Sequence, residues 1–133
     1  MFYLFTDGGA RGNPGPAAAG AFLFNDGKFL VDFASKYLGE TTNNIAEYEA
    51  LLLGLILAKK NNVTEITCHL DSELAVMQLN GAYQVKNQAL KGYYQKIMKE
   101  KDNFKEIKFV HVLRARNKYA DKMVNIVLDT LGK

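Results

Sequence analysis

The fold is decided by residues 2–27, which read FYLFTDGGARGNPGPAAAGAFLFNDG. Residues 2–6 are aromatic and apolar and are followed by Asp7-Gly8-Gly9, which predicts a buried strand ending there. Four glycines and both prolines of the chain fall within residues 8–16, which predicts a loop. Residues 18–24 and 29–37 predict two further strands, joined at Asn25-Asp26-Gly27, because Asp-Gly between apolar runs favours a hairpin.

Beyond this hairpin, helical and extended patterns alternate. Asn43 or Asn44 predicts a helix cap, and apolar residues then recur at spacings of three and four to about residue 60. Two further strands are predicted at residues 65–70 and 107–113, and three further helices at residues 72–79, 87–101 and 117–131. A hairpin followed by such alternation predicts an α/β fold: a five-stranded mixed sheet, with an antiparallel hairpin plus parallel strands, flanked by helices.

The length of 133 residues fits a single domain over residues 1–133. The chain has one cysteine, Cys68, which excludes an intrachain disulfide framework and fits a reducing compartment. No apolar run approaches the ~20 residues that cross a bilayer, and the first residues lack the basic region of a signal peptide. We therefore expect a cytoplasmic protein with no membrane association.

Positive charge is concentrated in one segment of the chain. Seven lysines lie between residues 84 and 108, against three acidic residues, while the formal net charge of the chain is only +3. Such a stretch indicates either a polyanionic partner or a solvated, lysine-rich helix face.

Four carboxylates are candidates for catalysis. Asp7 and Asp71 each follow an apolar strand, and Glu47 and Asp121 fall in the first turns of predicted helices. Any one of them is explained by helix capping or by the helix dipole, but their convergence at the carboxyl edge of a parallel sheet is not. Clustered carboxylates select Mg²⁺ or Mn²⁺ and suit two-metal phosphoryl chemistry.

Four blocks of sequence, TDGGARGNPGP at residues 6–16, TTNNIAEY at 41–48, LDS at 70–72 and NKYAD at 117–121, resemble successive motifs of type 1 ribonuclease H (ribonuclease HI). The resemblance covers nearly the whole chain, in order. It implies the ribonuclease H-like fold. It also implies endonucleolytic hydrolysis of the RNA strand of RNA/DNA hybrids, leaving 5′-phosphate and 3′-hydroxyl ends.

The resemblance also implies roles for individual residues. The catalytic and metal-binding set is Asp7, Glu47, Asp71 and Asp121, holding two Mg²⁺ ions, with Mn²⁺ as a substitute. In the family pattern Asp7 bridges the two ions, Asp121 shares the ion that activates water, and Glu47 and Asp71 hold the ion at the leaving 3′ oxygen. Glu47 also contacts a 2′-hydroxyl, the group that distinguishes RNA from DNA.

The same pattern implies a set of substrate-binding residues. Asn13, Asn43 and Asn44 match positions that touch the minor groove of the hybrid, and Thr42 matches one that contacts a DNA phosphate. Structural alternatives stay open, because Thr42 or Asn43 also suits a helix cap and Asn13 a turn. The resemblance implies the RNA/DNA hybrid as the partner, and we expect a monomer with no obligate protein partner.

The chain departs from the family pattern at two places. Residues 112–117 replace a longer glycine-rich and histidine-containing loop, so Arg114 or Arg116 is a candidate for positive charge near the site. His111 lies ten residues before Asp121, but its apolar neighbours indicate a packing residue within a strand. Residues 81–86 are too short for the basic protrusion of some members. We therefore expect a short-loop branch lacking that protrusion.

Three other interpretations remain open at this point. The first is a non-catalytic nucleic-acid-binding domain on the same fold. The second is a nucleotide-binding domain that uses residues 8–15 as a phosphate loop, although such a loop opens directly into a helix and this one does not. The third keeps the fold but acts on double-stranded RNA or in DNA integration.

Overall fold

The computed structural model describes residues 1–132 and contains a single mixed sheet. Its elements are β1 (Phe2–Ala10), β2 (Gly15–Phe24), β3 (Leu30–Thr41), α1 (Asn43–Lys60), β4 (Glu65–Leu70), α2 (Glu73–Leu79), α3 (Gln88–Lys101), β5 (Glu106–His111), the short 3₁₀ helix η1 (Arg114–Arg116) and α4 (Lys118–Leu131). The five strands lie in the order β3-β2-β1-β4-β5. β1 is antiparallel to β2 and parallel to β4, so the predicted five-stranded mixed sheet is confirmed.

Strand ends differ from the sequence-based expectations at three places. β1 continues to Ala10 rather than ending at residue 6, because Gly8 and Gly9 pair with β2, leaving only residues 11–14 as a loop. β3 extends to Thr41 through a bulge that keeps it paired with β2. β5 ends at His111 rather than at residue 113, where the chain leaves its ladder with β4.

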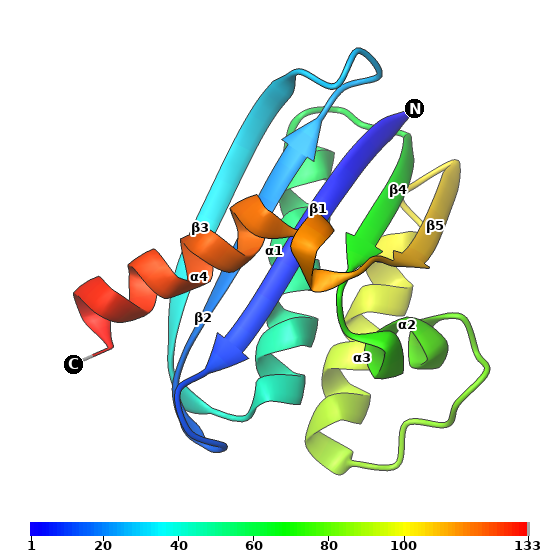
Figure 1. Ribbon diagram of the computed structural model, residues 1–133. Helices are drawn as coiled ribbons and strands as arrows, with labels where there is room; N and C mark the ends of the chain where they lie inside the picture. Colours follow the sequence, from blue (N-terminus) through cyan, green and yellow to red (C-terminus); the bar gives the residue numbers. More distant parts are fainter. Residues whose placement is uncertain (133) are drawn as a thin grey trace.

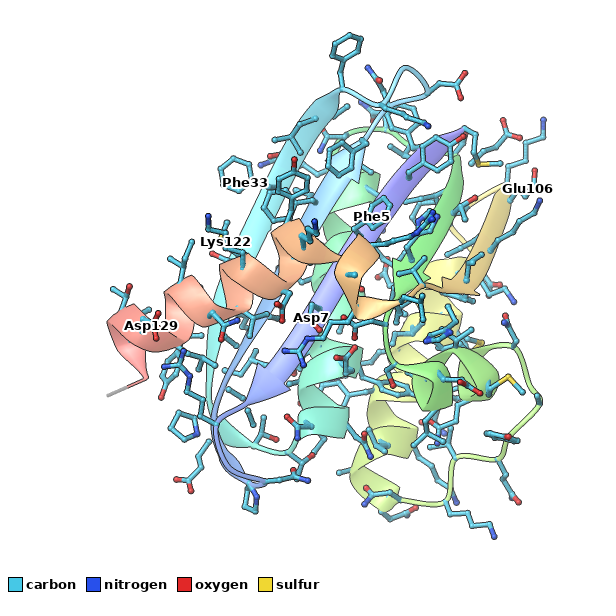
Figure 2. The ribbon with its side chains drawn as sticks, in the orientation of Figure 1. Phe5, Asp7, Phe33, Glu106, Lys122 and Asp129 are labelled. Carbon is cyan, nitrogen blue, oxygen red and sulfur yellow. The ribbon has the colours of Figure 1, made fainter. Side chains whose placement is uncertain are left out.

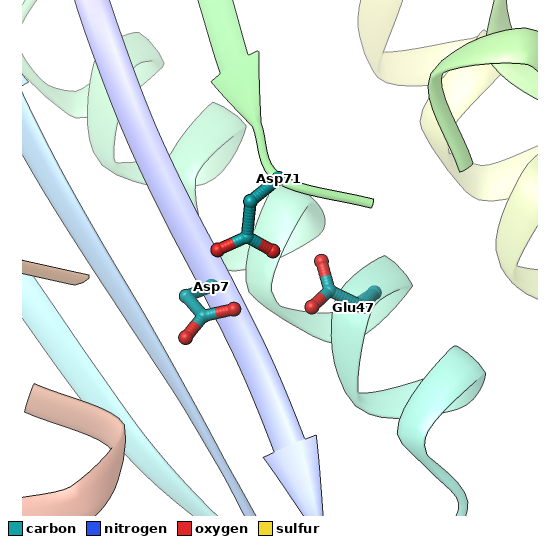
Figure 3. A group of neighbouring side chains, drawn as sticks. All are labelled: Asp7, Glu47 and Asp71. Atoms are coloured by element: carbon teal, nitrogen blue, oxygen red, sulfur yellow. The ribbon is translucent and has the colours of Figure 1, made fainter. Parts of the chain in front are cut away.

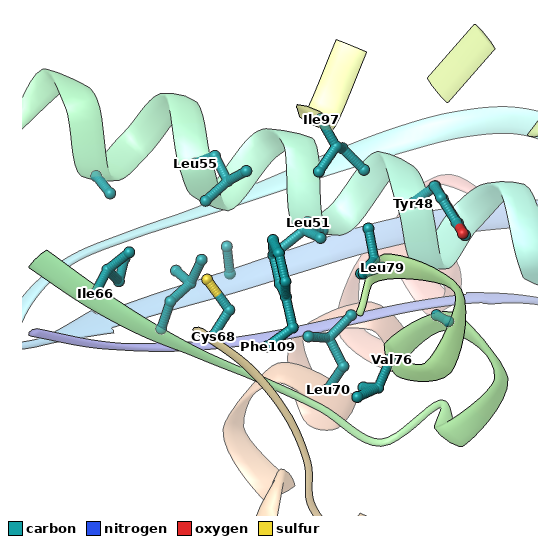
Figure 4. Close-up of a cluster of buried hydrophobic side chains, with 14 of the residues drawn as sticks. Tyr48, Leu51, Leu55, Ile66, Cys68, Leu70, Val76, Leu79, Ile97 and Phe109 are labelled. Carbon is teal, nitrogen blue, oxygen red and sulfur yellow. The ribbon is translucent and has the colours of Figure 1, made fainter. Parts of the chain in front are cut away.

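Helices cover the two faces of the sheet unequally (Figure 1). On one face α1 packs against β1 and β2, and α3 packs against α1. The main apolar core fills this layer and includes Leu51, Leu55 and Ile66 (Figure 4). A Cβ on Gly54 of α1 would lie 2.7 Å from Leu4 of β1, so the helix packs unusually close to this strand. This close packing places α1 directly against the central strand of the sheet.

The opposite face is covered mainly by α4, which lies across β1 and β2 in front of the sheet in Figure 1. A smaller apolar cluster of Ala18, Val124, Val127 and Leu128 holds this helix in place. Aromatic residues of the strands therefore remain partly accessible beside α4. Within residues 1–132, none of the helices combines the length and the apolar character that spanning a bilayer requires.

Candidate active site

Asp7 and Asp71 lie side by side because of the register of two parallel strands. The β1–β4 ladder ends with the pair Thr6 and Leu70, and the two aspartates are the next residue of each chain. The expected meeting at one sheet edge is therefore confirmed. Asp7 nevertheless lies inside β1, because beyond this point the strand still pairs with β2, where Asp7 faces Gly20.

Glu47 joins the two aspartates from the helix layer. It lies on α1, whose backbone passes so close to β1 that a Cβ on Gly8 would overlap the carbonyl oxygen of Ala46. Only glycine permits this approach. Asp7, Glu47 and Asp71 each offer a carboxylate oxygen within 4.8 Å of the other two, and Figure 3 shows the three side chains converging.

Burial and neighbouring like charges disfavour the ionised forms of Asp7 and Glu47. Burial, followed by the charge of Asp71, raises the pKa of Asp7 from 3.8 to about 7. Burial, followed by the charges of Asp7 and Asp71, raises the pKa of Glu47 well above its ordinary value. Among the described residues, Glu47 Oε2 is buried and has no hydrogen-bond partner. A buried, unpartnered oxygen within an all-carboxylate donor set fits a hard divalent cation.

Asp7, Glu47, Asp71 and Asp121 all line one pocket of about 460 Å³, the carboxylate pocket. Asp121 stands apart from the three converging carboxylates. It lies in the first turn of α4 and accepts a hydrogen bond of 3.0 Å from Arg114 Nη2. Arg114 lines this pocket and Arg116 does not. His111 ends β5 as an exposed residue and is also absent from the pocket lining, so its placement within a strand is confirmed while a packed environment is not.

Asn117 is a residue of the site whose contribution the sequence did not reveal. Although it precedes α4, as expected of a cap, its side chain makes no capping hydrogen bond. Instead it is 1% exposed, and its Nδ2 donates to the carbonyl of Thr6 at 2.8 Å and to Asp71 Oδ2 at 3.2 Å. It thereby ties the start of α4 to β1 and orients Asp71. Its place in the NKYAD block is the only sequence signal for this role.

The four expected substrate-binding residues lie around the start of α1. Thr42, not Asn43 or Asn44, is the N-cap, and its hydroxyl accepts from the amide of Ile45. Asn13 Oδ1 accepts from the backbone amide of Asn43 at 3.0 Å, and Asn43 Oδ1 accepts from that of Ala10 at 2.8 Å.

This network joins the glycine-rich loop to the helix. It orients the two carbonyl oxygens inward, so the amide NH₂ groups of Asn13 and Asn43 have no partner among residues 1–132. Both asparagines are exposed, as is Asn44. Asn43 lines the pocket that contains the carboxylates, Asn13 is hydrogen-bonded to its backbone, and Asn44 follows it on α1.

The lysine-rich segment forms α3 and its flanks. Lys86, Lys91, Lys96 and Lys99 are exposed, and Lys96 Nζ lies 5.3 Å from the ring centre of Tyr93. Tyr93 and Tyr94 are half-buried and pack against the main core. The tyrosines therefore serve packing, and a polyanion-binding role for the lysines stays a prediction.

Comparison with known proteins identifies the family. The reverse transcriptase-like family matches residues 5–127. Ribonuclease HI of Halobacterium salinarum is 35% identical over 127 residues, covering 96% of this chain and 64% of that protein. The solved structure of RNase H1 from this archaeon aligns with a TM-score of 0.94 at 34% identity, over 96% of this chain and 97% of the other. The chain belongs to the type 1 ribonuclease H family.

Two other relatives extend this comparison. LC11-RNase H1, solved in complex with an RNA/DNA hybrid, aligns with a TM-score of 0.91 and 40% identity over 97% of both chains. A bifunctional protein of Mycobacterium tuberculosis is 40% identical over 129 residues, or 96% of this chain. The chain spans only 35% of the length of that mycobacterial protein.

Proposed function

We propose that this chain hydrolyses the RNA strand of RNA/DNA hybrids endonucleolytically, leaving 5′-phosphate and 3′-hydroxyl ends. The observation that carries the proposal is the convergence of Asp7, Glu47 and Asp71 where the parallel β1–β4 ladder ends. A protein that only binds a polyanion gains nothing from buried negative charge at its binding surface. Membership of the ribonuclease H family and the hybrid bound to LC11-RNase H1 support the choice of substrate.

The residues that would hold the cofactor are Asp7, Glu47, Asp71 and Asp121. We infer two divalent ions, Mg²⁺ with Mn²⁺ as a substitute, which would neutralise these carboxylates and stabilise the charge that develops on the phosphodiester. Asn117 holds Asp71 in place by its hydrogen bond to Oδ2. Arg114 orients Asp121 and, in this short-loop chain, supplies the positive charge beside it.

Substrate recognition follows from the surface around the start of α1. The amide NH₂ groups of Asn13, Asn43 and Asn44 suit the acceptors that base edges display in a minor groove. Thr42, which caps α1, lies where a helix N-terminus favours a phosphate. We further infer that residues 1–133 act as one catalytic domain, as a monomer in the cytoplasm that requires no partner protein or membrane.

The test is cleavage of an end-labelled RNA/DNA hybrid with Mg²⁺, with Mn²⁺ and with EDTA, alongside RNA/RNA and DNA/DNA duplexes. We expect metal-dependent cutting of the RNA strand only, lost in Asp7→Asn and retained in Asp26→Asn, whose carboxyl is 79% exposed and distant from the cluster in sequence. Tight hybrid binding without cutting would instead make the chain a nucleic-acid-binding domain. Cutting of RNA/RNA would widen the substrate class.

A further inference from the structure

A second pocket opens on the α4 face of the sheet, with a volume of about 470 Å³. Aromatic rings from four separate elements line it: Tyr3 and Phe5 of β1, Phe24 of β2, His69 of β4 and Tyr119 of α4. None of the residues that line it also lines the carboxylate pocket. The hydrolysis proposed above therefore makes no use of this cavity.

The rings of this aromatic pocket form flat surfaces at different inclinations. Phe5 and His69 stack with ring centres 4.3 Å apart and planes inclined by 6°. Phe24 meets Phe5 edge-on at 5.8 Å and lies 6.4 Å from Tyr119. Tyr119 is 67% exposed, so its ring is available at the mouth of the pocket. Exposed π-faces in a cleft are what a planar heterocycle stacks upon.

The charge around the rings has one sign. Lys28, Arg116 and Lys118 line the pocket, and no carboxylate of residues 1–132 lines it. Within residues 1–132, none of these three cations forms an ion pair with a carboxylate. Lys118 is the first residue of α4, so the N-terminus of a 14-residue helix also points its positive dipole end toward this region. The pocket is therefore complementary to an anion that is attached to a planar ring.

We propose that this aromatic pocket binds a single nucleotide, with its base stacked among Phe5, His69 and Tyr119 and its phosphate against Arg116 and Lys118. Two sources supply this chemistry: a free mononucleotide, or the unpaired terminal nucleotide of a nucleic-acid strand. Phe5 and Asp7, both labelled in Figure 2, share one face of β1 and lie about 7 Å apart along the strand. Because Phe5 lines the aromatic pocket and Asp7 the carboxylate pocket, the two pockets are neighbours.

The site is tested by following backbone amide NMR signals during titration of the protein in EDTA. EDTA keeps the carboxylate cluster free of cations, so that cluster repels phosphate. The ligands are adenosine monophosphate, adenosine and ribose 5-phosphate. We expect saturable shifts at Phe5, His69 and Tyr119, with adenosine monophosphate binding more tightly than either fragment. Shifts at Gly8 and Gly9 instead, or equal binding of ribose 5-phosphate, would overturn the proposal.

Two exposed variants separate stacking from charge. Tyr119→Ser should weaken adenosine and adenosine monophosphate alike, by about tenfold, the usual contribution of one base-stacking ring. Arg116→Ala should weaken adenosine monophosphate and leave adenosine unchanged. Tyr83→Ser is the matched control, because Tyr83 is a 51% exposed tyrosine outside the pocket, and it should change neither affinity. Unchanged affinities in Tyr119→Ser would overturn the proposal.

The two sources are distinguished by a hybrid duplex with blunt ends and the same duplex with one unpaired nucleotide. Shifts of the pocket amides by the overhang alone identify the strand end as the source. Saturation by adenosine monophosphate, with no response to the overhang, identifies the free nucleotide. Asp7→Asn should keep nucleotide binding while losing hydrolysis. Hydrolysis therefore tests the proposed function, and nucleotide binding tests this pocket independently.

Discussion

Asp7→Asn should stabilise the metal-free protein at neutral pH while abolishing catalysis. Asp7 is buried beside Asp71 and Glu47, and burial followed by the charge of Asp71 raises its pKa from 3.8 to about 7. Asparagine has nearly the same shape and no charge, so the variant keeps the packing and removes the repulsion. A gain in stability from a substitution that destroys activity is the behaviour expected of a site built for cations.

The magnitude follows from the difference between the folded and unfolded pKa. Raising the pKa of one carboxyl from 3.8 to about 7 corresponds to about 4 kcal/mol, at about 1.4 kcal/mol for each tenfold change in proton affinity. Because the folded state holds this proton more tightly, the unfolded state binds fewer protons between about pH 4 and pH 7. The free energy of unfolding of the wild type therefore falls across this window, and the loss is complete above about pH 7.

The assay is urea denaturation of wild type and Asp7→Asn in EDTA, at intervals from pH 4 to pH 8. The free energies of unfolding of the two proteins should differ least at pH 4. By pH 8 the variant should be more stable by about 4 kcal/mol, which corresponds to roughly 15 °C in Tm. Excess Mg²⁺ should restore the wild type at pH 8 and have a smaller effect on the variant. Asp26→Asn, at an exposed carboxyl, is the control. Parallel pH profiles for wild type and Asp7→Asn would refute the reasoning.

Three further substitutions, the first with Gly9→Ala as its control, test how the site is held. Gly8→Ala should lower stability in thermal denaturation by about 2 kcal/mol or more, because the added Cβ would overlap the backbone of α1. Gly9→Ala should change stability by less than about 1 kcal/mol, because its Cβ would meet only a side chain, at 3.7 Å. Asn117→Ala should cost about 2 kcal/mol and lower kcat, since two hydrogen bonds from a buried amide are lost. Arg114→Ala should change stability by less than about 1 kcal/mol. It should lower kcat about tenfold, because one charged hydrogen bond to Asp121 is lost. An unchanged kcat would exclude Arg114 from the site.

Much of the sheet and the carboxylate set was predictable because both depend on local patterns. Apolar runs followed by Asp7 and Asp71 predicted two strand ends, and the parallel register then places these residues together. The Asp-Gly hairpin between the second and third strands was predictable for the same reason. Sequence spacing also located Glu47 on the helix that follows the third strand.

The structural features that could not be predicted from the sequence depend on contacts between distant segments of the chain. Glycine and proline favour a loop locally, yet Gly8 and Gly9 extend β1 because small residues of β2 stand opposite them. Arg114 and Arg116 are equivalent in sequence, but one turn of 3₁₀ helix directs them into different pockets. Asn117 resembles a cap, and only the position of β1 above it reveals its hydrogen bond to Thr6.

The two pockets differ in the charge of the residues that line them, and they share Asn117 as a neighbour. One is lined by carboxylates, including the only described group of three acidic side chains close enough to hold a metal ion. The other is lined by cations and aromatic rings, and no carboxylate of residues 1–132 lines it. Asn117 is buried between them, lining the aromatic pocket while donating to Asp71. A ligand that moved Asn117 would therefore also move a carboxylate of the catalytic set. Coupling between the two pockets requires that a ligand bind one position of Asn117 more tightly than another. Nucleotide must then change the affinity for Mg²⁺ by the same factor by which Mg²⁺ changes the affinity for nucleotide.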